Sequence, residues 1–333
     1  MDQKLNSLCD LFIRNRDIIK SEFFWESSYI YPVCAAIFME KGRTADPERM
    51  EECKKILKDN TGIFSNFRGI VKLAMISLLA VDSEPERKMT HSMEVYDALK
   101  DHFFASSYLP VASMLIADTV QPSEYESIAG RTRRIYDLMK ADHPFLTCSE
   151  DSIFAAMMAL SDRQEAELVE EAEQCYDILH GQFISCNAIQ SLSHVLAMVN
   201  LPADVKCRRT MDLFYGLKKR GYTYGTGYEL ATLGVPALLV SDSSEQDKVL
   251  EEIIEVDDFL SGQKGYGLLG IGRKQRLMHS ALIVTSAHME QDAAQTIRQA
   301  AIGGTVSMMA AQQAAMCAAV AASSAAAASS ASS

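Results

Sequence analysis

Residues 153–179 read IFAAMMALSDRQEAELVEEAEQCYDIL and contain two helical patterns that differ in their exposure to water. In the second half, Leu168, Ala172 and Cys175 recur four and then three residues apart, and glutamates fill much of the remaining face. This spacing predicts an amphipathic helix that is half buried. The first half, residues 153–160, has no polar side, which predicts a helix that is covered on nearly every side.

The same pair of patterns returns at a regular interval along the chain. The dipeptide Tyr-Asp begins at Tyr96, Tyr136 and Tyr176, and each time a polar loop and then an apolar stretch follow it. Similar pairs extend to both sides of these three, and we count about seven in all. Stacked helix pairs bury one helix layer and leave the other half exposed. The sequence therefore predicts an all-α fold of about seven stacked αα-hairpin repeats of roughly 40 residues, forming an open superhelix or a closed α/α toroid.

Helix starts are also marked in the sequence. The segments Ser83–Glu86, Ser123–Glu126 and Ser243–Gln246 fit the capping box, in which a serine oxygen and an acidic or amide side chain three residues later satisfy free backbone N–H groups. Each segment follows an apolar stretch and is expected to begin the first helix of a repeat.

The repeat pattern predicts one αα-hairpin domain over residues 1–288. The remaining residues 289–333 are rich in Ala, Met and Ser, and residues 299–333 carry no charge. A membrane span is disfavoured there, because glutamines and serines interrupt the segment and alanine gains little from hydrocarbon. We expect a C-terminal helix over residues 307–322 that docks on the last repeat or self-associates, followed by a frayed end.

The composition is that of a soluble globular protein without affinity for nucleic acid. Of the 333 residues, 48% are apolar and 23% are charged, and 44 acidic against 32 basic side chains give a net charge of −12. Binding to a phosphate backbone requires clustered Lys and Arg, and no such cluster occurs in the sequence. Charged residues interrupt the first turns of the chain, unlike the apolar core of a signal peptide, so we expect a cytoplasmic protein.

No motif for a metal, a nucleotide or a nucleophile has the sequence context that its chemistry requires. The eight cysteines are scattered without a Cys-x-x-Cys pair or zinc spacing, and we expect reduced, mostly buried thiols. The segment Gly265–Gly270 matches the letters of a dinucleotide-binding turn, but a predicted helix precedes it instead of a buried strand. We therefore expect neither a cofactor nor a metal site.

Three stretches resemble a known family. They are Thr61–Gly69 (TGIFSNFRG), His143–Thr147 (HPFLT) with Ser149–Ser152 (SEDS), and Gln190–His194 (QSLSH). Together with the uncharged C-terminal end, they are similar to an uncharacterised domain-of-unknown-function family of Firmicutes, family 4003, over nearly the whole chain. The resemblance implies a bacterial, cytosolic, helical protein, and it carries over no activity, cofactor or catalytic residue.

The loops that join the first helix of each repeat to the second are expected to lie at one end of the array. Their polar and aromatic residues would form a single rim, which is the candidate ligand-binding surface. The candidates are Glu26, Tyr29, Phe67, Arg68, Tyr108, Ser149, Glu150, Asp151, Asn187, Gln190, His194, Tyr228 and Glu229.

Several of these residues also have a purely structural interpretation. Ser149, Glu150 and Asp151 suit a helix N-terminus, where they would cap backbone N–H groups. On an apolar helix, His194 fits a hydrogen-bonded core histidine better than a ligand-binding residue. Arg68 differs, because a guanidinium opposes the positive end of a helix dipole and should have another partner, either a carboxylate or an anionic ligand.

We expect a binding or scaffolding module whose rim or concave surface receives a protein, a peptide or a small molecule. The repeat pattern favours this function, and no catalytic motif opposes it. The alternative is an α/α-toroid enzyme, a hydrolase or lyase acting on a saccharide-like small molecule, with Glu150 and Asp151, or Glu229, as acid and base. Two carboxylates in one deep pocket would favour the enzyme, whereas carboxylates bonded to helix backbone would count against it.

Overall fold

The computed structural model of the chain describes residues 1–69, 71–240, 242–267 and 270–292. Within these ranges the fold is helical, with fourteen α-helices, two 3-10 helices and no β-strand. The predicted all-α fold class is confirmed. The expected C-terminal helix over residues 307–322 lies outside the described residues.

The helices follow one another through short connections. Their bounds are α1 Gln3–Glu22, α2 Ile30–Glu40, α3 Pro47–Asn60, α4 Lys72–Ala80, α5 Pro85–Lys100, α6 Leu109–Thr119, α7 Tyr125–Asp142, α8 Asp151–Ala159, α9 Glu165–Leu179, α10 Cys186–Ala197, α11 Ala203–Lys219, α12 Leu230–Leu239, α13 Ser243–Ser261 and α14 Arg273–Asp292. The 3-10 helices are η1 Asn66–Arg68, before α4, and η2 Pro122–Glu124, before α7.

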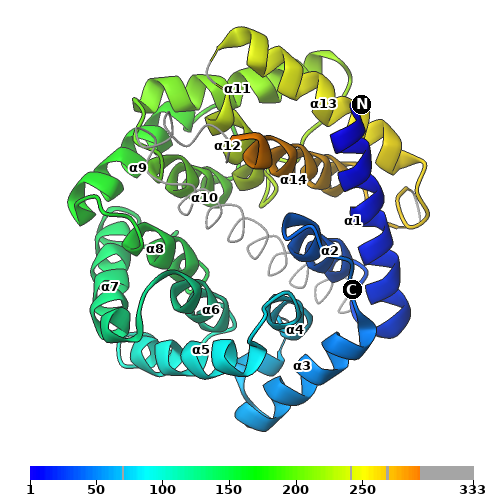
Figure 1. Ribbon diagram of the computed structural model, residues 1–333. Helices are drawn as coiled ribbons and strands as arrows, with labels where there is room; N and C mark the ends of the chain where they lie inside the picture. The colour runs from blue at the N-terminus through cyan, green and yellow to red at the C-terminus, as the bar shows by residue number, and fades with distance from the viewer. Residues whose placement is uncertain (70, 241, 268–269, 293–333) are drawn as a thin grey trace, which may run out of the picture. The chain divides into compact units, whose positions relative to one another are not determined.

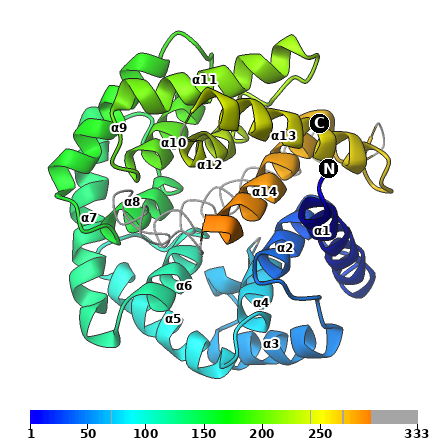
Figure 2. The same cartoon turned by 45° about the horizontal axis from the view of Figure 1, so that its top comes forward.

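The described chain divides into two compact units. The N-unit comprises residues 14–166, and the C-unit comprises residues 1–13 together with the described residues from 167 onward. In the N-unit, α5 packs between α3 and α7 in one layer, while α2 packs beside α4 and α6 beside α8 in a second layer (Figure 1). In the C-unit, α11 packs beside α13, and α12 packs between α10 and α14 (Figure 2).

The two layers differ in burial as the two sequence patterns predict. Every residue of α8 is buried, from Asp151 to Ala159. In α9 the buried positions include Leu168, Ala172 and Cys175, which lie along one face of the helix. Burial of each large apolar side chain contributes about 1.5–3 kcal/mol, so the mostly buried even-numbered helices supply much of the stability of both units.

Aromatic contacts recur beside the positions of the Tyr-Asp dipeptides. In each case a phenylalanine from a loop between an odd and an even helix packs edge-on against a ring near the end of the next odd helix. The pairs are Phe67 with Tyr96, Phe103 with Tyr136 and, in the C-unit, Phe183 with Phe214, with ring centroids 5.0, 5.3 and 4.9 Å apart. Such edge-to-face pairs contribute about 0.5–1.5 kcal/mol beyond their buried area.

The predicted capping boxes are wrong in detail. At α13 the cap is Asp242, one residue before the expected serine, whose carboxylate accepts from Ser244 N at 2.8 Å. At α5 the Asp82 carboxylate accepts from Glu84 N at 2.8 Å in the turn before the helix, and the N-cap residue Glu84 forms no side-chain cap. Before α7, the reciprocal box is formed by Gln121 and Glu124 on η2. An acidic or amide side chain was available just upstream in each case, so the serines are not needed as caps.

In the C-unit, the start of α1 packs against α14. Lys4 Nζ donates a hydrogen bond to the carbonyl oxygen of Ala287 at 2.5 Å, and the Phe12 ring lies 6.0 Å from that of His279. Residues at opposite ends of the described chain are therefore neighbours within one compact unit.

The helices α13 and α14 are joined by a buried ion pair. Arg276 donates from Nε and Nη2 to the two carboxylate oxygens of Asp257, at 2.8 and 2.7 Å. Asp257 is 1% exposed. A bidentate guanidinium–carboxylate pair of this kind satisfies both charges, but either one is costly to leave alone in the interior.

The substitution Asp257→Ala is expected to lower the free energy of unfolding by about 3–5 kcal/mol, because Arg276 then keeps its charge in the interior without a carboxylate. Urea denaturation followed by circular dichroism measures the change. The matched control is Glu251→Ala, which removes the exposed Arg220–Glu251 pair at 3.2 Å and should cost at most about 1 kcal/mol. Equal losses for the two variants would contradict the assigned role of the buried pair.

Candidate functional site

The candidate rim residues of the N-unit belong to the loops that follow α1, α3, α5 and α7. Because α3, α5 and α7 pack side by side and each is followed by an even helix that returns along it, these loops lie at the same end of the two layers (Figure 1). We call this end of the N-unit the loop end. In the C-unit, Asn187, Gln190 and His194 lie on α10, and Tyr228 and Glu229 lie in the loop before α12.

Arg68 has a structural partner. Its Nε donates to Thr61 Oγ1 at 2.9 Å, and its Nη2 donates to the carbonyl oxygen of Lys58 at 2.5 Å. Lys58 lies in the last turn of α3, where the helix dipole favours a positive charge. The expectation that Arg68 needs a carboxylate or an anionic ligand is therefore wrong, because terminal groups of α3 occupy its guanidinium.

Asp151 is the most strongly perturbed of the candidates. Its carboxylate is 2% exposed and accepts a hydrogen bond from Cys148 N at 2.8 Å, as a capping residue does. Burial raises the pKa of Asp151 to about 7, and the hydrogen bond from Cys148 N only partly offsets that effect. Ser149 is exposed, and Glu150 is half-buried.

Tyr108 and Glu150 are the two N-unit candidates that the structure brings together. The Tyr108 hydroxyl lies 3.5 Å from Glu150 Oε2, which is a long hydrogen bond. Burial, reinforced by the charge of Glu150, raises the pKa of Tyr108 to about 12. The Tyr108 hydroxyl therefore stays protonated and acts as a donor near neutral pH.

The other N-unit candidates have separate surroundings. Glu26 forms a long ion pair with Lys72 at 3.9 Å. Phe67 is fully buried against Tyr96 and so belongs to the core instead of a binding surface. Tyr29 is half-buried at the start of α2.

The C-unit candidates occupy two places. On α10, Gln190 and His194 are buried one turn apart, and Asn187 is exposed. At the start of α12, the Tyr228 hydroxyl accepts from Gln275 Nε2 at 2.8 Å. Glu229 is buried against the preceding loop.

The loop before α12 is shaped around Glu229. A Cβ added to Gly225 would lie 2.4 Å from the carboxyl carbon of Glu229, a distance that no side chain can adopt. Glycine is therefore required at position 225 for the Glu229 carboxyl group to reach its buried place.

The loop end also carries a feature that the sequence interpretation missed. Large apolar side chains point into solvent at equivalent places in four successive loops. Phe24, Phe64, Phe104 and Phe145 are 71%, 99%, 98% and 98% exposed. Trp25 and Ile63 accompany the first two and are also exposed. We call these six side chains the apolar row.

In the first and third loops, an adjacent aromatic residue explains why the phenylalanine of the row faces water. In the first loop Phe23 is buried while Phe24 is exposed. In the third loop Phe103 packs on Tyr136 while Phe104 does not. One ring of each adjacent pair thus anchors the loop, and the other is left over. The C-unit repeats this arrangement, with Phe183 buried and Ile184 96% exposed.

The loops that carry the row contain few charges. No Asp, Glu, Lys or Arg occurs in residues 61–67, 103–117 or 144–149. Their polar groups are mainly the hydroxyl groups of serine, threonine and tyrosine and the amide of asparagine. These three segments are therefore apolar and uncharged, although the four loops also carry Glu26, Arg68, Asp101 and Glu150.

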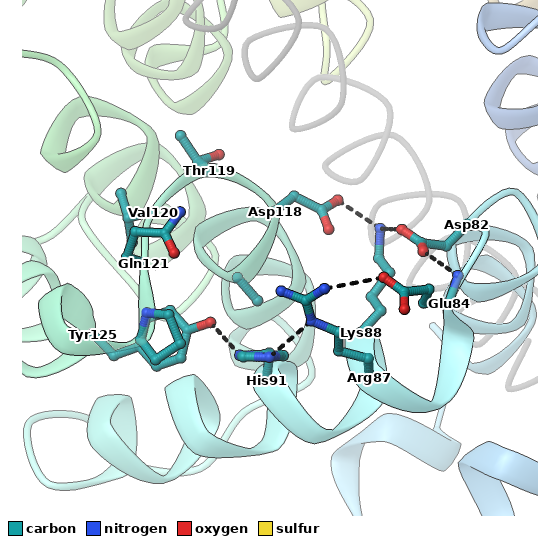
Figure 3. Close-up of a pocket in the computed structure, with 12 residues that line it drawn as sticks. Asp82, Glu84, Arg87, Lys88, His91, Asp118, Thr119, Val120, Gln121 and Tyr125 are labelled. Carbon is teal, nitrogen blue, oxygen red and sulfur yellow. Dashed lines mark hydrogen bonds and ion pairs between the residues drawn. The ribbon is translucent and has the colours of Figure 1, made fainter.

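A polar cavity of about 250 Å³ lies at the opposite end of the N-unit, where α4 and α6 end and α5 and α7 begin (Figure 3). It is lined by Asp82, Glu84, Arg87, Lys88, His91, Ala117, Asp118, Thr119, Val120, Gln121, Pro122 and Tyr125. None of the rim candidates lines it.

The charged groups of this cavity pair with one another. Lys88 Nζ, which is largely buried, lies 2.6 Å from Asp118 and 3.7 Å from Asp82. The His91 ring bonds to the Tyr125 hydroxyl at 2.8 Å (Figure 3). The cavity is therefore a junction of compensated charges between two helix pairs. The sequence interpretation did not identify it, because its partners come from segments that lie far apart along the chain.

Comparison with known proteins identifies a family without an assigned activity. A family model described as "Protein of unknown function (DUF4003)" matches residues 15–314. No curated protein and no solved structure matches the chain.

The described residues contain neither a membrane span nor a metal-binding cluster. None of the helices there has the length and apolar character needed to cross a membrane. The same residues contain no group of three or more His, Cys, Asp and Glu side chains placed to hold a metal ion.

The raised pKa of Asp151 gives a pH-dependent stability. The folded chain binds this proton more tightly than the unfolded chain, whose carboxyl has the ordinary value of 3.8. The contribution is therefore fully present below about pH 4 and is lost as the pH rises to about 7. The substitution Asp151→Asn keeps an acceptor for Cys148 N and removes the titration. Above pH 7, the variant should be more stable than the parent by roughly 2–4 kcal/mol.

Urea denaturation between pH 4 and pH 8 measures this difference. The control is Asp142→Asn, at an exposed residue of the preceding helix, which should leave the pH profile of the parent unchanged. A profile of Asp151→Asn that runs parallel to that of the parent would refute the assignment.

Proposed function

The chain belongs to the DUF4003 family, and we propose that it is a binding module that holds a macromolecular partner against the apolar row. The observation that carries the proposal is the recurrence of exposed Phe24, Phe64, Phe104 and Phe145 on four successive loops. Single exposed apolar residues are normal on protein surfaces, but a set that gathers on one end of a unit is typical of an interaction site.

Energetics favour a partner large enough to cover the whole row. Burial of one such side chain contributes about 1.5–3 kcal/mol, so the six together would contribute on the order of 10 kcal/mol. Association itself costs about 4–15 kcal/mol in lost freedom and ordering. A small ligand that covers one ring would gain too little, whereas a protein surface that covers all of them would gain enough.

The row is also held in place before binding. The contacts of Phe67 with Tyr96 and of Phe103 with Tyr136 fix the second and third loops on the neighbouring helices. Side chains carried by anchored loops lose less conformational freedom on binding, which improves affinity. Depletion of charge and enrichment in aromatic rings are, in addition, typical of the core of a protein interface.

The repeat architecture is part of the same proposal. We propose about seven helix pairs in one stacked array, which the alternation of partly exposed odd helices and buried even helices supports. The contacts of Lys4 and Phe12 with α14 favour a closed toroid over an open superhelix.

The alternative, an enzyme, has less support. The Asp151 carboxylate accepts from the backbone N–H of Cys148, which is the arrangement expected of a cap. Glu150 and Asp151 do not line the cavity of Figure 3, and the third candidate, Glu229, belongs to the C-unit. A hydrolase or lyase therefore stays a prediction from the sequence.

Photo-cross-linking in living cells tests the binding proposal. Phe64, Phe104 or Phe145 is replaced, one at a time, by p-benzoylphenylalanine, which keeps the aromatic ring. Irradiation should give covalent adducts of higher mass at each of these positions, because all three side chains would contact the partner.

The control places the same photoreactive residue at Leu138, which is 37% exposed on α7 and is not part of the row. It should give no adduct. An absence of adducts at the three row positions, or the same adduct from Leu138, would count against the proposal.

A further inference from the structure

The apolar row also indicates what its partner is. We propose that the row binds the row of a second copy of this chain about a two-fold axis. This inference rests on the proposed function, since it names the occupant of the same surface. Three properties of the row carry it: its interval, its charge and its area.

The spacing between the exposed side chains of the row is the same in a second copy of the chain. The exposed side chains stand on successive helix pairs, and packed helices lie about 8–10 Å apart. Phe64 and Phe104 are almost fully exposed, so each leaves space beside it that a side chain from outside can fill. A second copy presents side chains at the same interval by construction. A two-fold axis then makes the contact self-complementary, as in most homodimers.

The low charge of the apolar row makes it a more favourable place for contact between two copies than the rest of the surface. Two copies with a net charge of −12 each repel one another over most orientations. Ile63, Phe64, Phe104 and Phe145 lie on the uncharged segments 61–67, 103–117 and 144–149, so contact between these parts of two rows places no like charges opposite one another. Only Phe24 and Trp25, at one end of the row, stand beside a charged residue, Glu26.

The charged residues that precede the two central loops are complementary between two copies of the chain. The second loop follows the exposed dipeptide Lys58-Asp59, and the third follows the exposed dipeptide Lys100-Asp101. About a two-fold axis that sets these loops against one another, Lys58 can meet Asp101 of the other copy, while Lys100 keeps its ion pair with Asp97 at 2.8 Å. Such edge pairs set the register of a contact more than its strength.

The area of the row fits a standard dimer. A large aromatic side chain buries about 150–250 Å². At the exposures of Phe24, Trp25, Phe64, Phe104 and Phe145, the row offers on the order of 800 Å² of apolar surface. A stable interface of standard size needs about 800 Å² from each partner. One further copy of the chain is thus sufficient to cover the row.

Sedimentation equilibrium of the purified full chain tests the inference. Between about 1 and 100 µM, the parent should behave as a dimer of twice 36.8 kDa, and 1 M NaCl should leave the dimer intact because the contact is apolar. The double variant Phe64→Ser, Phe104→Ser should raise the dissociation constant by about 100-fold or more, since four rings leave the interface of the dimer.

Two controls keep the result specific. Leu138→Ser removes a partly exposed apolar side chain outside the row and should leave the dissociation constant unchanged. The far-UV circular dichroism spectrum should be the same for the double variant as for the parent, which shows that the variant is folded, while the melting temperature of the parent alone should rise with protein concentration. The two substituted side chains are 98–99% exposed and make no core contacts that could be lost.

Three outcomes would overturn the inference. The first is a monomeric parent over the whole concentration range. The second is a dimer that survives the double variant; if deletion of residues 299–333 abolishes that dimer, the uncharged C-terminal segment is responsible. The third is a monomer that floats with phosphatidylcholine vesicles only when the row is intact, which would identify a bilayer as the partner.

The cross-linking experiment separates failure of this inference from failure of the proposed function. Adducts from Phe104 that contain two copies of the chain support both. Adducts with a different macromolecule, together with a monomeric purified parent, overturn the second copy as the partner and leave the binding module intact. No adduct and a monomeric parent overturn both.

Discussion

The edge-on contact between a loop phenylalanine and the ring near the end of the next odd helix is the interaction on which the rest of the structure depends. It joins Phe67 to Tyr96, Phe103 to Tyr136 and Phe183 to Phe214. Each contact ties the loop of one helix pair to the following pair. These aromatic contacts therefore fix both the stacking of the helix pairs and the position of the loops. The exposed side chains are carried by the same loops, so their positions are fixed by the same contacts.

The N-unit has two ends of different character. At the end where α5 and α7 begin, Lys88 pairs with Asp82 and Asp118, and the charged groups around the cavity compensate one another. At the loop end, residues 61–67 and 103–108 are uncharged and present Phe64 and Phe104 to solvent. The cavity thus gathers paired charges, whereas the stretches that carry these two exposed rings have none. A solvated, charged loop end would have been the ordinary arrangement for a protein without a partner.

The sequence predicted the helices well and the site poorly, and the reasons are physical. The spacing of apolar residues follows burial directly, so the complete burial of residues 153–159 on α8 and the buried face of α9 were predicted from the sequence. The partner of Arg68 was not predictable, because it is a backbone carbonyl that only the geometry of the turn brings near. The apolar row was visible as a regular spacing of aromatic residues, but adjacent rings such as Phe103 and Phe104 are chemically alike. Which of the two packs and which faces water depends on the direction of the loop, and the sequence does not encode that direction locally.

The contact of α1 with α14 has a consequence for how the chain folds during synthesis. Lys4 is made 283 residues before its partner Ala287, and Phe12 is likewise made long before His279. All described segments of the N-unit, residues 14–166, are available once residue 166 has emerged from the ribosome. The C-unit must wait for α14, so the amphipathic start of α1 stays without its partner helix over that whole interval and is exposed to chaperones for longer than the helices of the N-unit.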